Sequence, residues 1–203
     1  MKVIGITGGV GAGKSSILKY INKNYRTDII YADDLAAQLE KNGEPCFAPL
    51  VELLGEDIIG EDREIDRKLM ASKVFNNDPL LEKVNDIVHP AVKEYIVNYI
   101  NKLREEDNLD IFFIEAALLI ECGYKEIVDE MWYVYADLSV RRERLKASRG
   151  YSDQKINSIL DNQLTDEQFR ENSDFVIDNS FDPEYTYKQI DKKLSYIKRI
   201  GEE

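Results

Sequence analysis

The sequence predicts an α/β fold in which a five-stranded parallel sheet carries helices on both faces. Five short apolar runs are each long enough for a buried strand, and they lie at 3–7, 27–34, 109–116, 129–137 and 173–180. Stretches with helical periodicity separate them. Strands of a parallel sheet are covered on both faces and joined through helices, so unbroken apolar runs alternating with helical segments are expected. A glycine-rich stretch directly after the first run is the third observation, since such loops join strand to helix in this fold class.

The first apolar run is followed by a phosphate-loop motif. Residues 8–15 read GGVGAGKS, which fits G-x-x-x-x-G-K-[ST] at every fixed position. Beyond the motif, Ile17, Leu18 and Ile21 recur on one face of a helix. The motif therefore lies between a strand and a helix, the context in which it holds a phosphate chain. A glycine-rich turn with a chance lysine is the alternative, and this context argues against it.

Each residue type in this loop has a chemical role. Glycines let backbone N–H groups turn inward around a β-phosphate, and the helix starting near Gly13 directs its positive end to the same place. Lys14 can reach β- and γ-oxygens, and the Ser15 hydroxyl can bind Mg²⁺. The loop thus predicts that a phosphate chain is held. It leaves open whether the γ-phosphoryl goes to water, goes to another molecule or is only sensed.

Two carboxylates, Asp33 and Asp34, end the second apolar run, and a helical pattern begins at Leu35. Ligands of doubly wound sheets bind outside the carboxyl ends of the strands. A free Asp has a pKa of about 3.9, so it is ionised at neutral pH and can orient a hydroxyl and accept its proton. Asp also favours the N-cap position of a helix. One Asp of the pair can cap while the other takes part in chemistry.

Glu115 ends the third run, at the same edge of the predicted sheet. A carboxylate there can bind Mg²⁺, directly or through water. A charged strand terminus without a function is the alternative, and Glu121 is a nearby competitor for the metal role.

The region at about 43–106 is rich in helix signals and has no strong strand run. Asp78-Pro79 and His89-Pro90 each read as a helix start with proline at the first helical position. So much helix exceeds what one crossover between strands needs, and we interpret it as an inserted substrate-side domain. His89 is the only histidine, and a lone histidine is more often structural than catalytic.

A second helical stretch, at about 141–170, is basic in its first part. Its cations are Arg141, Arg142, Arg144, Lys146 and Arg149. Thr165 to Gln168 has the pattern of a capping box, which predicts a further helix start. In a protein that handles phosphates, this segment is a candidate lid. A solvated helix face is the alternative for such a run of charges.

Composition excludes several classes of function. Lys and Arg number 27 against 39 Asp and Glu, a net charge of −12 that is opposite to what a nucleic-acid-binding surface needs. Cys46 and Cys122 lie far apart, which predicts reduced thiols and no structural zinc. The longest apolar stretch is too short to cross a bilayer, and no signal-peptide layout is present. We expect a cytoplasmic protein that binds neither nucleic acid nor membrane.

Several segments, taken in order, resemble the dephospho-coenzyme A kinase family. The opening IGITGGVGAGKS is similar to the start of that family, and YADDLA lies where the family has a D-A-D-like segment. EIDRKLMASKVF and IVHPAV resemble its inserted helical domain, and EAALLIE resembles its proline-leucine-leucine stretch. SDFVIDNS is similar to its C-terminal strand and turn. The resemblance covers nearly the whole chain.

The resemblance implies a P-loop kinase fold made by one chain. Its core would lie at about 1–42 and 107–203, its substrate-binding insertion at about 43–106 and its lid at about 141–170. The implied reaction transfers the γ-phosphoryl of ATP, bound with Mg²⁺, to the ribose 3′-hydroxyl of dephospho-coenzyme A. The implied partners are these small molecules, for a protein that is a monomer or a small homo-oligomer.

The resemblance also implies roles for individual residues. Asp33 and Lys14 would be catalytic, and Asp33, Arg67 and His89 would contact dephospho-coenzyme A. Ser15 and Glu115 would hold Mg²⁺, Glu115 directly or through water. The implied ATP-binding residues are Gly8, Gly9, Gly11, Ala12, Gly13, Lys14, Ser15, Ser16 and Arg149.

The sequence departs from the family pattern at places outside the glycine loop and Asp33. Tyr31 stands where the family has the first Asp of the D-A-D segment, Ala37 where an Arg is common and Ala117 where a Pro is usual. In the lid, Ser148 occupies the usual position of an Arg, and Arg149 follows one place later. Ile159 stands where a further lid Arg is frequent.

Two other functions compete with this interpretation. A nucleoside or nucleoside-monophosphate kinase uses the same loop and lid. A nucleotide-gated switch or adaptor protein is a hypothesis from another class, but the sequence has no Asn-Lys-x-Asp tetrapeptide for reading a guanine base.

Overall fold

The protein is described by a computed structural model that covers the backbone of residues 1–201 and the side chains of residues 1–197. The chain divides into two compact units. Unit 1 is formed by Met1–Ile29 together with the chain from Leu103 onward, and unit 2 by Ile30–Lys102. Unit 2 begins before the insertion expected at about 43–106, because it includes the helix that follows the second strand.

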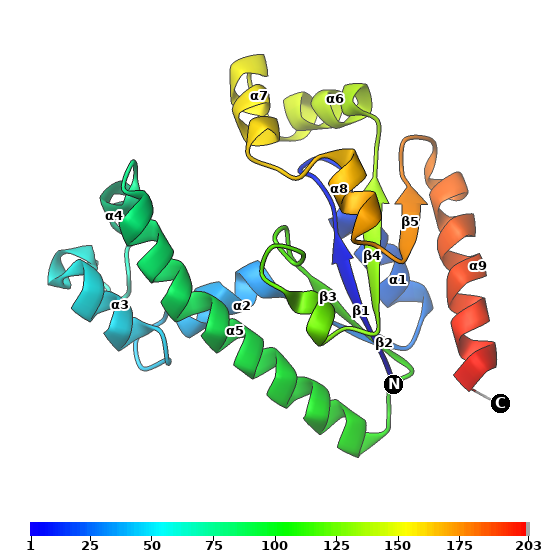
Figure 1. Cartoon of the computed structure of the whole chain (residues 1–203), viewed down its shortest axis with the longest axis horizontal. Helices are drawn as coiled ribbons and strands as arrows, with labels where there is room; N and C mark the ends of the chain where they lie inside the picture. Colours follow the sequence, from blue (N-terminus) through cyan, green and yellow to red (C-terminus); the bar gives the residue numbers. More distant parts are fainter. Residues whose placement is uncertain (202–203) are drawn as a thin grey trace. The chain divides into compact units, whose positions relative to one another are not determined.

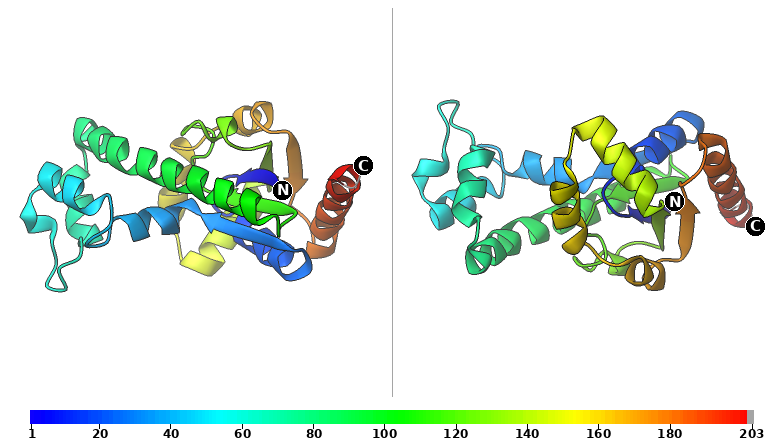
Figure 2. Two further views of the ribbon diagram at one scale, coloured as in Figure 1. Left: turned by 90° about the horizontal axis from the view of Figure 1, so that it is seen from below. Right: turned by 90° about the horizontal axis from the view of Figure 1, so that it is seen from above.

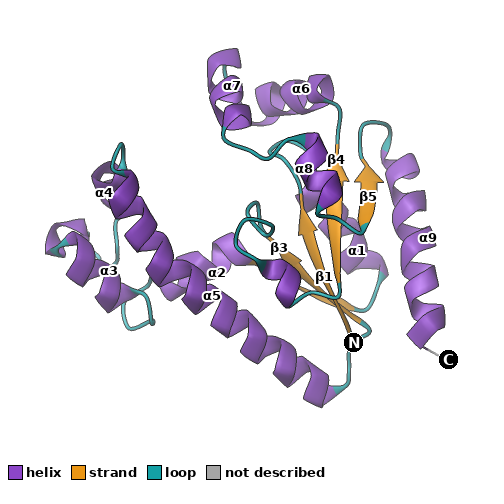
Figure 3. Ribbon diagram, in the orientation of Figure 1, coloured by secondary structure: helices purple, strands orange, loops and turns teal. Residues whose placement is uncertain are grey.

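A five-stranded sheet lies at the centre of the fold (Figures 1 and 3). Its strands are β1 (Lys2–Thr7), β2 (Thr27–Tyr31), β3 (Ile111–Glu115), β4 (Glu130–Tyr135) and β5 (Phe175–Asp178), in the order β2-β3-β1-β4-β5. The pairs β1–β3, β1–β4 and β4–β5 are parallel. Each strand coincides with a predicted apolar run, although β1 begins one residue before its run, at Lys2, and the predicted α/β fold is confirmed.

The middle strands are largely apolar because both of their faces are covered. Ile4, Phe112, Phe113 and Trp132 are all 0% exposed. The ring of Trp132 packs edge-on against Phe113 at 5.6 Å between ring centres. Side chains of successive residues point to opposite faces of a sheet, so burial of both Phe112 and Phe113 requires a layer on each side. This is why the strand pattern is an unbroken run rather than an alternation.

Unit 1 also contains helices, some of which cover the sheet. They are α1 (Lys14–Asn24), α6 (Leu138–Arg149), α7 (Asp153–Asp161), α8 (Asp166–Glu171), α9 (Pro183–Gly201) and the short 3₁₀ helix η2 (Tyr124–Glu126). Figure 2 shows α1 and α8 on opposite sides of the strands. Phe169 of α8 stacks on Tyr133 of β4 at 4.7 Å between ring centres. The predicted capping box at the start of α8 is confirmed, with Thr165 and Gln168 bonded reciprocally.

The C-terminal helix α9 is fastened to α1 by polar contacts. The hydroxyls of Tyr20 and Tyr25 both donate to the carboxylate of Asp191, at 2.8 and 2.7 Å. The ring of Tyr20 stacks on Tyr187 at 3.7 Å between ring centres. Burial, together with the adjacent Asp191 carboxylate, raises the pKa of Tyr20 to about 12. Both tyrosines therefore remain protonated donors throughout the physiological pH range.

The first residue of β4, Glu130, joins three elements. Its carboxylate accepts from Lys2 Nζ at 2.6 Å and from Trp132 Nε1 at 2.9 Å, and it lies 3.0 Å from Lys193 Nζ of α9. Burial by itself raises the pKa of Glu130, but these three donors outweigh it and the pKa is lowered. A carboxylate whose pKa is lower in the folded state stabilises the fold above its unfolded pKa and ceases to do so as pH falls through the folded value.

Replacing Glu130 by Gln should therefore destabilise the protein most at neutral pH. We expect the free energy of unfolding to fall by about 1–3 kcal/mol at pH 7, the scale of hydrogen bonds to charged groups. The difference from wild type should shrink as pH is lowered below the ordinary Glu pKa of 4.5. Denaturant unfolding at several pH values measures it. Glu184→Gln is the control, because its pair with Lys188 is exposed and 3.9 Å long. A Glu130→Gln difference independent of pH would contradict the prediction.

Unit 2 is mainly helical. Its elements are α2 (Ala32–Leu39), α3 (Phe47–Leu54), the 3₁₀ helix η1 (Glu56–Ile58), α4 (Arg67–Val74) and most of α5 (Asp78–Glu106). An isolated bridge pairs Ile59 with Ile65. Asp66 caps α4 by accepting from the backbone N–H groups of Lys68 and Leu69. The predicted helical character of this region is therefore observed.

One predicted helix start in unit 2 is wrong. His89-Pro90 does not begin a helix, because α5 continues through Pro90 for 29 residues in all. A proline inside a helix removes one backbone hydrogen bond and disturbs the preceding turn. Burial outweighs this cost, since one face of α5 is apolar along its length. The buried side chains of this face are Val84, Val88, Val92, Ile96, Ile100 and Leu103.

Candidate active site

The glycine loop joins β1 to α1, and two of its glycines lie against side chains from distant parts of the chain. Gly13 is the N-cap of α1 with a φ of 98°, a left-handed conformation that other residues rarely adopt. A Cβ atom at Gly13 would overlap the side-chain nitrogen of Asn179, and one at Gly9 would overlap the guanidinium of Arg141. The loop is thus packed against α6 and against the turn after β5.

Lys14, the first residue of α1, folds its side chain back over the loop. Its Nζ atom donates to the carbonyl oxygen of Gly8 at 2.6 Å and lies 3.5 Å from Oε1 of Glu115. Glu115 reaches this place because β3 pairs in parallel with β1 and ends at the same edge. Ser15 follows Lys14 in the first helical turn with an exposed side chain. The structure therefore brings the predicted Lys14 and Glu115 together at the loop, and Ser15 follows Lys14 in the sequence.

An arginine of α6 binds the backbone of the loop. Nε of Arg141 donates to the carbonyl oxygen of Val10 at 2.9 Å, and Nη2 donates to Oε1 of Gln163 at 2.8 Å. The same Gln163 oxygen accepts from the N–H of Val10 at 3.3 Å. Burial lowers the pKa of Arg141, while Tyr133 and Asp166 act to raise it. From the sequence, Arg141 was predicted only as part of a basic stretch, and no role was predicted for Gln163, which lies 153 residues from Val10.

A second cluster holds the carbonyl of Ala12. The side-chain nitrogen of Asn179 donates to it at 2.7 Å, and Nη1 of Arg144 at 3.3 Å. Nη2 of Arg144 also donates to the backbone oxygen of Asn179 at 2.9 Å. The hydroxyl of Thr186 donates to Oδ1 of Asn179 at 2.9 Å. Asn179 lies in the SDFVIDNS segment that carried part of the resemblance, but no role had been predicted for it.

Arg149 lies at the other end of α6. Its side chain is exposed, and its guanidinium carbon is 5.8 Å from the centre of the Tyr151 ring. Ser148 donates its hydroxyl to the carbonyl of Arg144 within the same helix. The hydrogen bonds described between α6 and the loop come from Arg141 and Arg144. ATP binding by Arg149 therefore stays a prediction.

The segment expected to form a lid comprises α6, α7 and α8, and Figure 1 shows β4 leading directly into α6. Gly150 ends α6 in a left-handed conformation. Across this turn, Asp153 of α7 lies 2.7 Å from Lys146 Nζ and 3.5 Å from Arg142 Nη1. Exposed ion pairs of this kind contribute little to stability. A lid function of this segment stays a prediction.

Asp33 and Asp34 lie in the first turn of α2, and both are exposed. The second strand was expected to end in these carboxylates, and one of them was considered as an N-cap. Instead, β2 ends at Tyr31, which is itself the N-cap of α2 and makes no side-chain capping bond. Carboxylates inside the first turn are stabilised by the helix dipole, so the helix includes both residues. A catalytic role for Asp33 stays a prediction.

Arg67 and His89 also belong to unit 2. Arg67 is the first residue of α4, and its Nη2 and Nε atoms donate to Oε2 of Glu40 at 2.9 and 3.3 Å. Glu40 is buried whereas the Arg67 side chain is 59% exposed, so the pair fastens α4 to the end of α2 and leaves part of the guanidinium accessible. His89 is half-buried on α5. Contact of either residue with a substrate stays a prediction.

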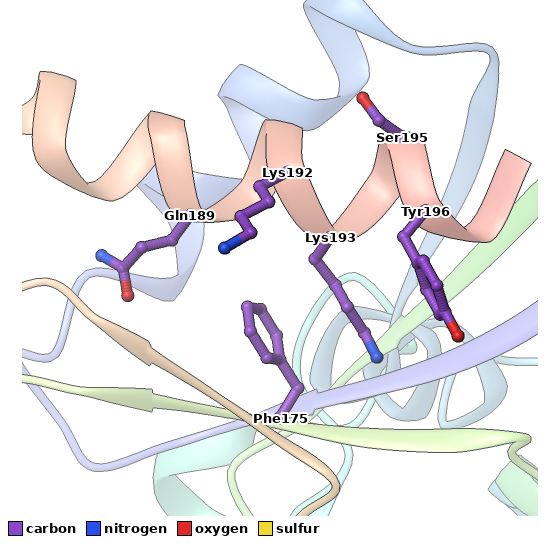
Figure 4. A pocket seen from close by; sticks show the side chains of 6 residues that line it. All are labelled: Phe175, Gln189, Lys192, Lys193, Ser195 and Tyr196. Carbon is purple, nitrogen blue, oxygen red and sulfur yellow. The ribbon is translucent and has the colours of Figure 1, made fainter. Parts of the chain in front are cut away.

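A pocket of about 570 Å³ lies between the edge strand β5 and α9, away from the glycine loop (Figure 4). It is lined by Phe175, Gln189, Lys192, Lys193, Ser195 and Tyr196. Gln189 bonds to the backbone of Asp178, and the ammonium of Lys193 lies 5.4 Å from the centre of the Phe175 ring. These contacts pack α9 on the sheet, and we assign the pocket no part in the reaction.

Other features of the described chain bear on the predictions. Both cysteines, Cys46 and Cys122, are free. Residues 1–201 contain no group of three or more His, Cys, Asp and Glu side chains that could hold a metal ion. No described helix combines the length and the apolar composition needed to cross a membrane.

Comparison with known proteins gives a consistent result. The family model described as dephospho-CoA kinase matches residues 2–183. A dephospho-CoA kinase of Aquifex aeolicus (strain VF5) is 33% identical over 199 residues, which cover 98% of this chain and 99% of the relative.

Solved structures are similar over nearly the full length as well. A protein of Thermus thermophilus, TT1252, superposes with a TM-score of 0.81 at 25% identity, covering 96% of each chain. Dephospho-CoA kinase from Campylobacter jejuni superposes with a TM-score of 0.72 at 21% identity, covering 98% of each chain. These likenesses confirm the P-loop kinase fold that the sequence resemblance implied.

Proposed function

The chain belongs to the dephospho-CoA kinase family, and we propose that its glycine loop and Lys14 hold the donor triphosphate while Asp33 serves the acceptor hydroxyl. The enzyme is a kinase that phosphorylates dephospho-coenzyme A at the ribose 3′-hydroxyl, using a nucleotide donor. The observation that supports this assignment of residues is the position of Lys14, whose ammonium lies over the loop and near Glu115.

At the donor end, the residues have to bind charge rather than form covalent bonds. Phosphoryl transfer proceeds mainly through positioning and electrostatic stabilisation. Backbone N–H groups of the loop would surround the β-phosphate, at the positive end of α1. Lys14 would exchange its contact with the Gly8 carbonyl for oxygens of the β- and γ-phosphates. Its positive charge would then lie close to the negative charge that develops on the transferred group and would stabilise it.

Mg²⁺ fits the oxygen donors present at this place. The exposed hydroxyl of Ser15 and the half-buried carboxylate of Glu115 are hard ligands of the type that Mg²⁺ prefers. Since residues 1–201 contain no cluster of three or more acidic, His or Cys ligands, the ion would complete its coordination with phosphate oxygens and water. When bound with ATP, it neutralises charge on the β- and γ-phosphates.

At the acceptor end, Asp33 would orient the ribose 3′-hydroxyl and accept its proton. The hydroxyl oxygen forms a bond to the γ-phosphorus, the bond to the β–γ bridging oxygen breaks, and ADP leaves. Arg67 and His89 would contact the substrate, and Arg149 would contact ATP from the lid. Closure of α6 and α7 over the nucleotide would exclude water, which otherwise competes as acceptor.

An acceptor screen tests the proposed function. Purified protein with ATP and Mg²⁺ is given dephospho-coenzyme A, a nucleoside, a nucleoside monophosphate or no acceptor, and the product is identified by ³¹P NMR. We expect a new 3′-phosphate on dephospho-coenzyme A and little turnover elsewhere. Consumption of the nucleoside monophosphate with dephospho-coenzyme A unchanged would favour the rival kinase. Slow hydrolysis that is independent of acceptor would favour a nucleotide-gated switch.

We propose a cytoplasmic enzyme, a monomer or a small homo-oligomer, whose partners are ATP and dephospho-coenzyme A rather than nucleic acid. The net charge of −12 supports the last point, because a strongly acidic surface repels a polyphosphate backbone.

A further inference from the structure

We propose that Asn179, oriented by Thr186, is a positioning residue that aims a backbone N–H of the glycine loop at the bound phosphates. The inference rests on the proposed phosphate-binding role of the loop and concerns how the loop is kept in its binding conformation. Its starting point is the carbonyl of Ala12, which accepts from Asn179 Nδ2 at 2.7 Å and from Arg144 Nη1 at 3.3 Å.

The peptide bond between Ala12 and Gly13 transmits the effect. It is trans, as the described peptide bonds all are. In a planar trans peptide, the C=O and N–H groups point in opposite directions. Two donors that hold the Ala12 oxygen toward α6 and the turn after β5 therefore direct the Gly13 N–H to the opposite side. Amide donors must point inward for such a loop to bind phosphate.

The orientation of the Asn179 amide is determined by its two neighbours. A carbonyl oxygen only accepts, so the NH₂ group of Asn179 must face Ala12, and Oδ1 faces the Thr186 hydroxyl at 2.9 Å. Asn179 is 9% exposed and Thr186 is 1% exposed. A buried amide with both ends satisfied is held in one orientation, because any other would leave a polar group unpaired.

A parallel arrangement two peptide bonds earlier supports this assignment. Arg141 Nε holds the carbonyl of Val10 at 2.9 Å, which by the same geometry directs the Gly11 N–H away from α6. Alternate carbonyls of the loop, those of Val10 and Ala12, are thus both bound from outside. Their partners come from α6 and from the turn after β5, so the loop conformation is imposed by distant parts of the chain before any nucleotide binds.

Inorganic tripolyphosphate is the probe that tests the proposal, because it reports on the loop without the base or the acceptor. Its affinity is measured by calorimetry for wild type and for Asn179→Asp, Thr186→Val and Thr186→Ser. Asn179→Asp should weaken binding by about tenfold or more, since a carboxylate would face the Ala12 oxygen. Thr186→Val should weaken it by about three- to fivefold, and Thr186→Ser should restore it. The variants that bind tripolyphosphate more weakly should also have a higher KM for ATP, in the same order, while KM for dephospho-coenzyme A stays unchanged.

Tyr20→Phe is the matched control. It removes a hydrogen bond that fastens α9 to α1, but it leaves Thr186 and the loop untouched. It should lower Tm and leave tripolyphosphate affinity as in wild type. If Thr186→Val lowers Tm in the same way and leaves the affinity unchanged, Thr186 is merely structural and the proposal is wrong. Because Thr186→Val is a near-isosteric change, this comparison remains decisive even where Asn179→Asp does not fold. Wild-type protein that fails to bind tripolyphosphate would overturn the phosphate-loop assignment as well.

Discussion

Lys14→Ala is expected to abolish turnover, with kcat lower by at least about 10³-fold, the scale on which charge-stabilising groups act in phosphoryl transfer. The Lys14 ammonium lies at the loop, 2.6 Å from the Gly8 carbonyl and 3.5 Å from Glu115. Its replacement removes the side-chain cation that we assign to the β- and γ-phosphates. The measurement is steady-state transfer to dephospho-coenzyme A, together with ATP affinity by calorimetry.

Lys19→Ala is the matched control for this variant. Lys19 is an exposed lysine on the same helix, so its removal changes net charge and helix composition equally but leaves the loop intact. It should retain wild-type kcat and KM. Circular dichroism establishes that both variants are folded. A Lys14→Ala enzyme with a rate near wild type would be incompatible with the assignment of the loop.

Asp33→Asn should lower kcat by roughly 10²-fold or more, which is the usual loss when general-base help is removed. The amide keeps the size of the carboxylate but cannot take a proton from the attacking hydroxyl. ATP affinity should be largely unchanged, because Asp33 is assigned to the acceptor and not to the donor. Single-turnover transfer with saturating dephospho-coenzyme A separates this loss of rate from a change in binding.

Asp34→Asn provides a stringent control. Asp33 and Asp34 are both exposed and both lie in the first turn of α2, so each substitution removes one charge from the same helix end. Their effects on stability should be alike, at about 0.3–1 kcal/mol. Any difference in rate between the two variants therefore reports on chemistry. If Asp34→Asn is the damaging change, the catalytic residue within the pair has been chosen incorrectly.

The sheet could be predicted from the sequence because a strand that is buried on both faces appears there as an unbroken apolar run. Strands such as β3, with Phe112 and Phe113 covered on opposite faces, are continuous apolar runs that periodicity identifies directly. Glu115 could be placed at the loop for the same reason, since its strand had to end at the same edge as the strand before the motif.

Other features could not be predicted, because they depend on competition between local preferences and burial, or on contacts with residues far away in the sequence. Pro90 carries a local signal for a helix start, but burial of a long apolar face of α5 outweighs it. Tyr31 is an unusual N-cap. Asp is favoured both at the N-cap and in the first turn of a helix, so the sequence could not show which of these positions Asp33 and Asp34 occupy. Asn179 bonds to a residue 167 positions away, and nothing in its own neighbourhood indicates that contact.

The separation of 167 positions between Asn179 and Ala12 has a consequence for the synthesis of the protein. The motif at 8–15 is translated well before Asn179 and Thr186. A nascent chain that already contains the complete motif still lacks the side chains that hold the Ala12 carbonyl. With the role proposed for Asn179, full affinity of the loop for a phosphate chain therefore develops only after Asn179 and Thr186 have been translated.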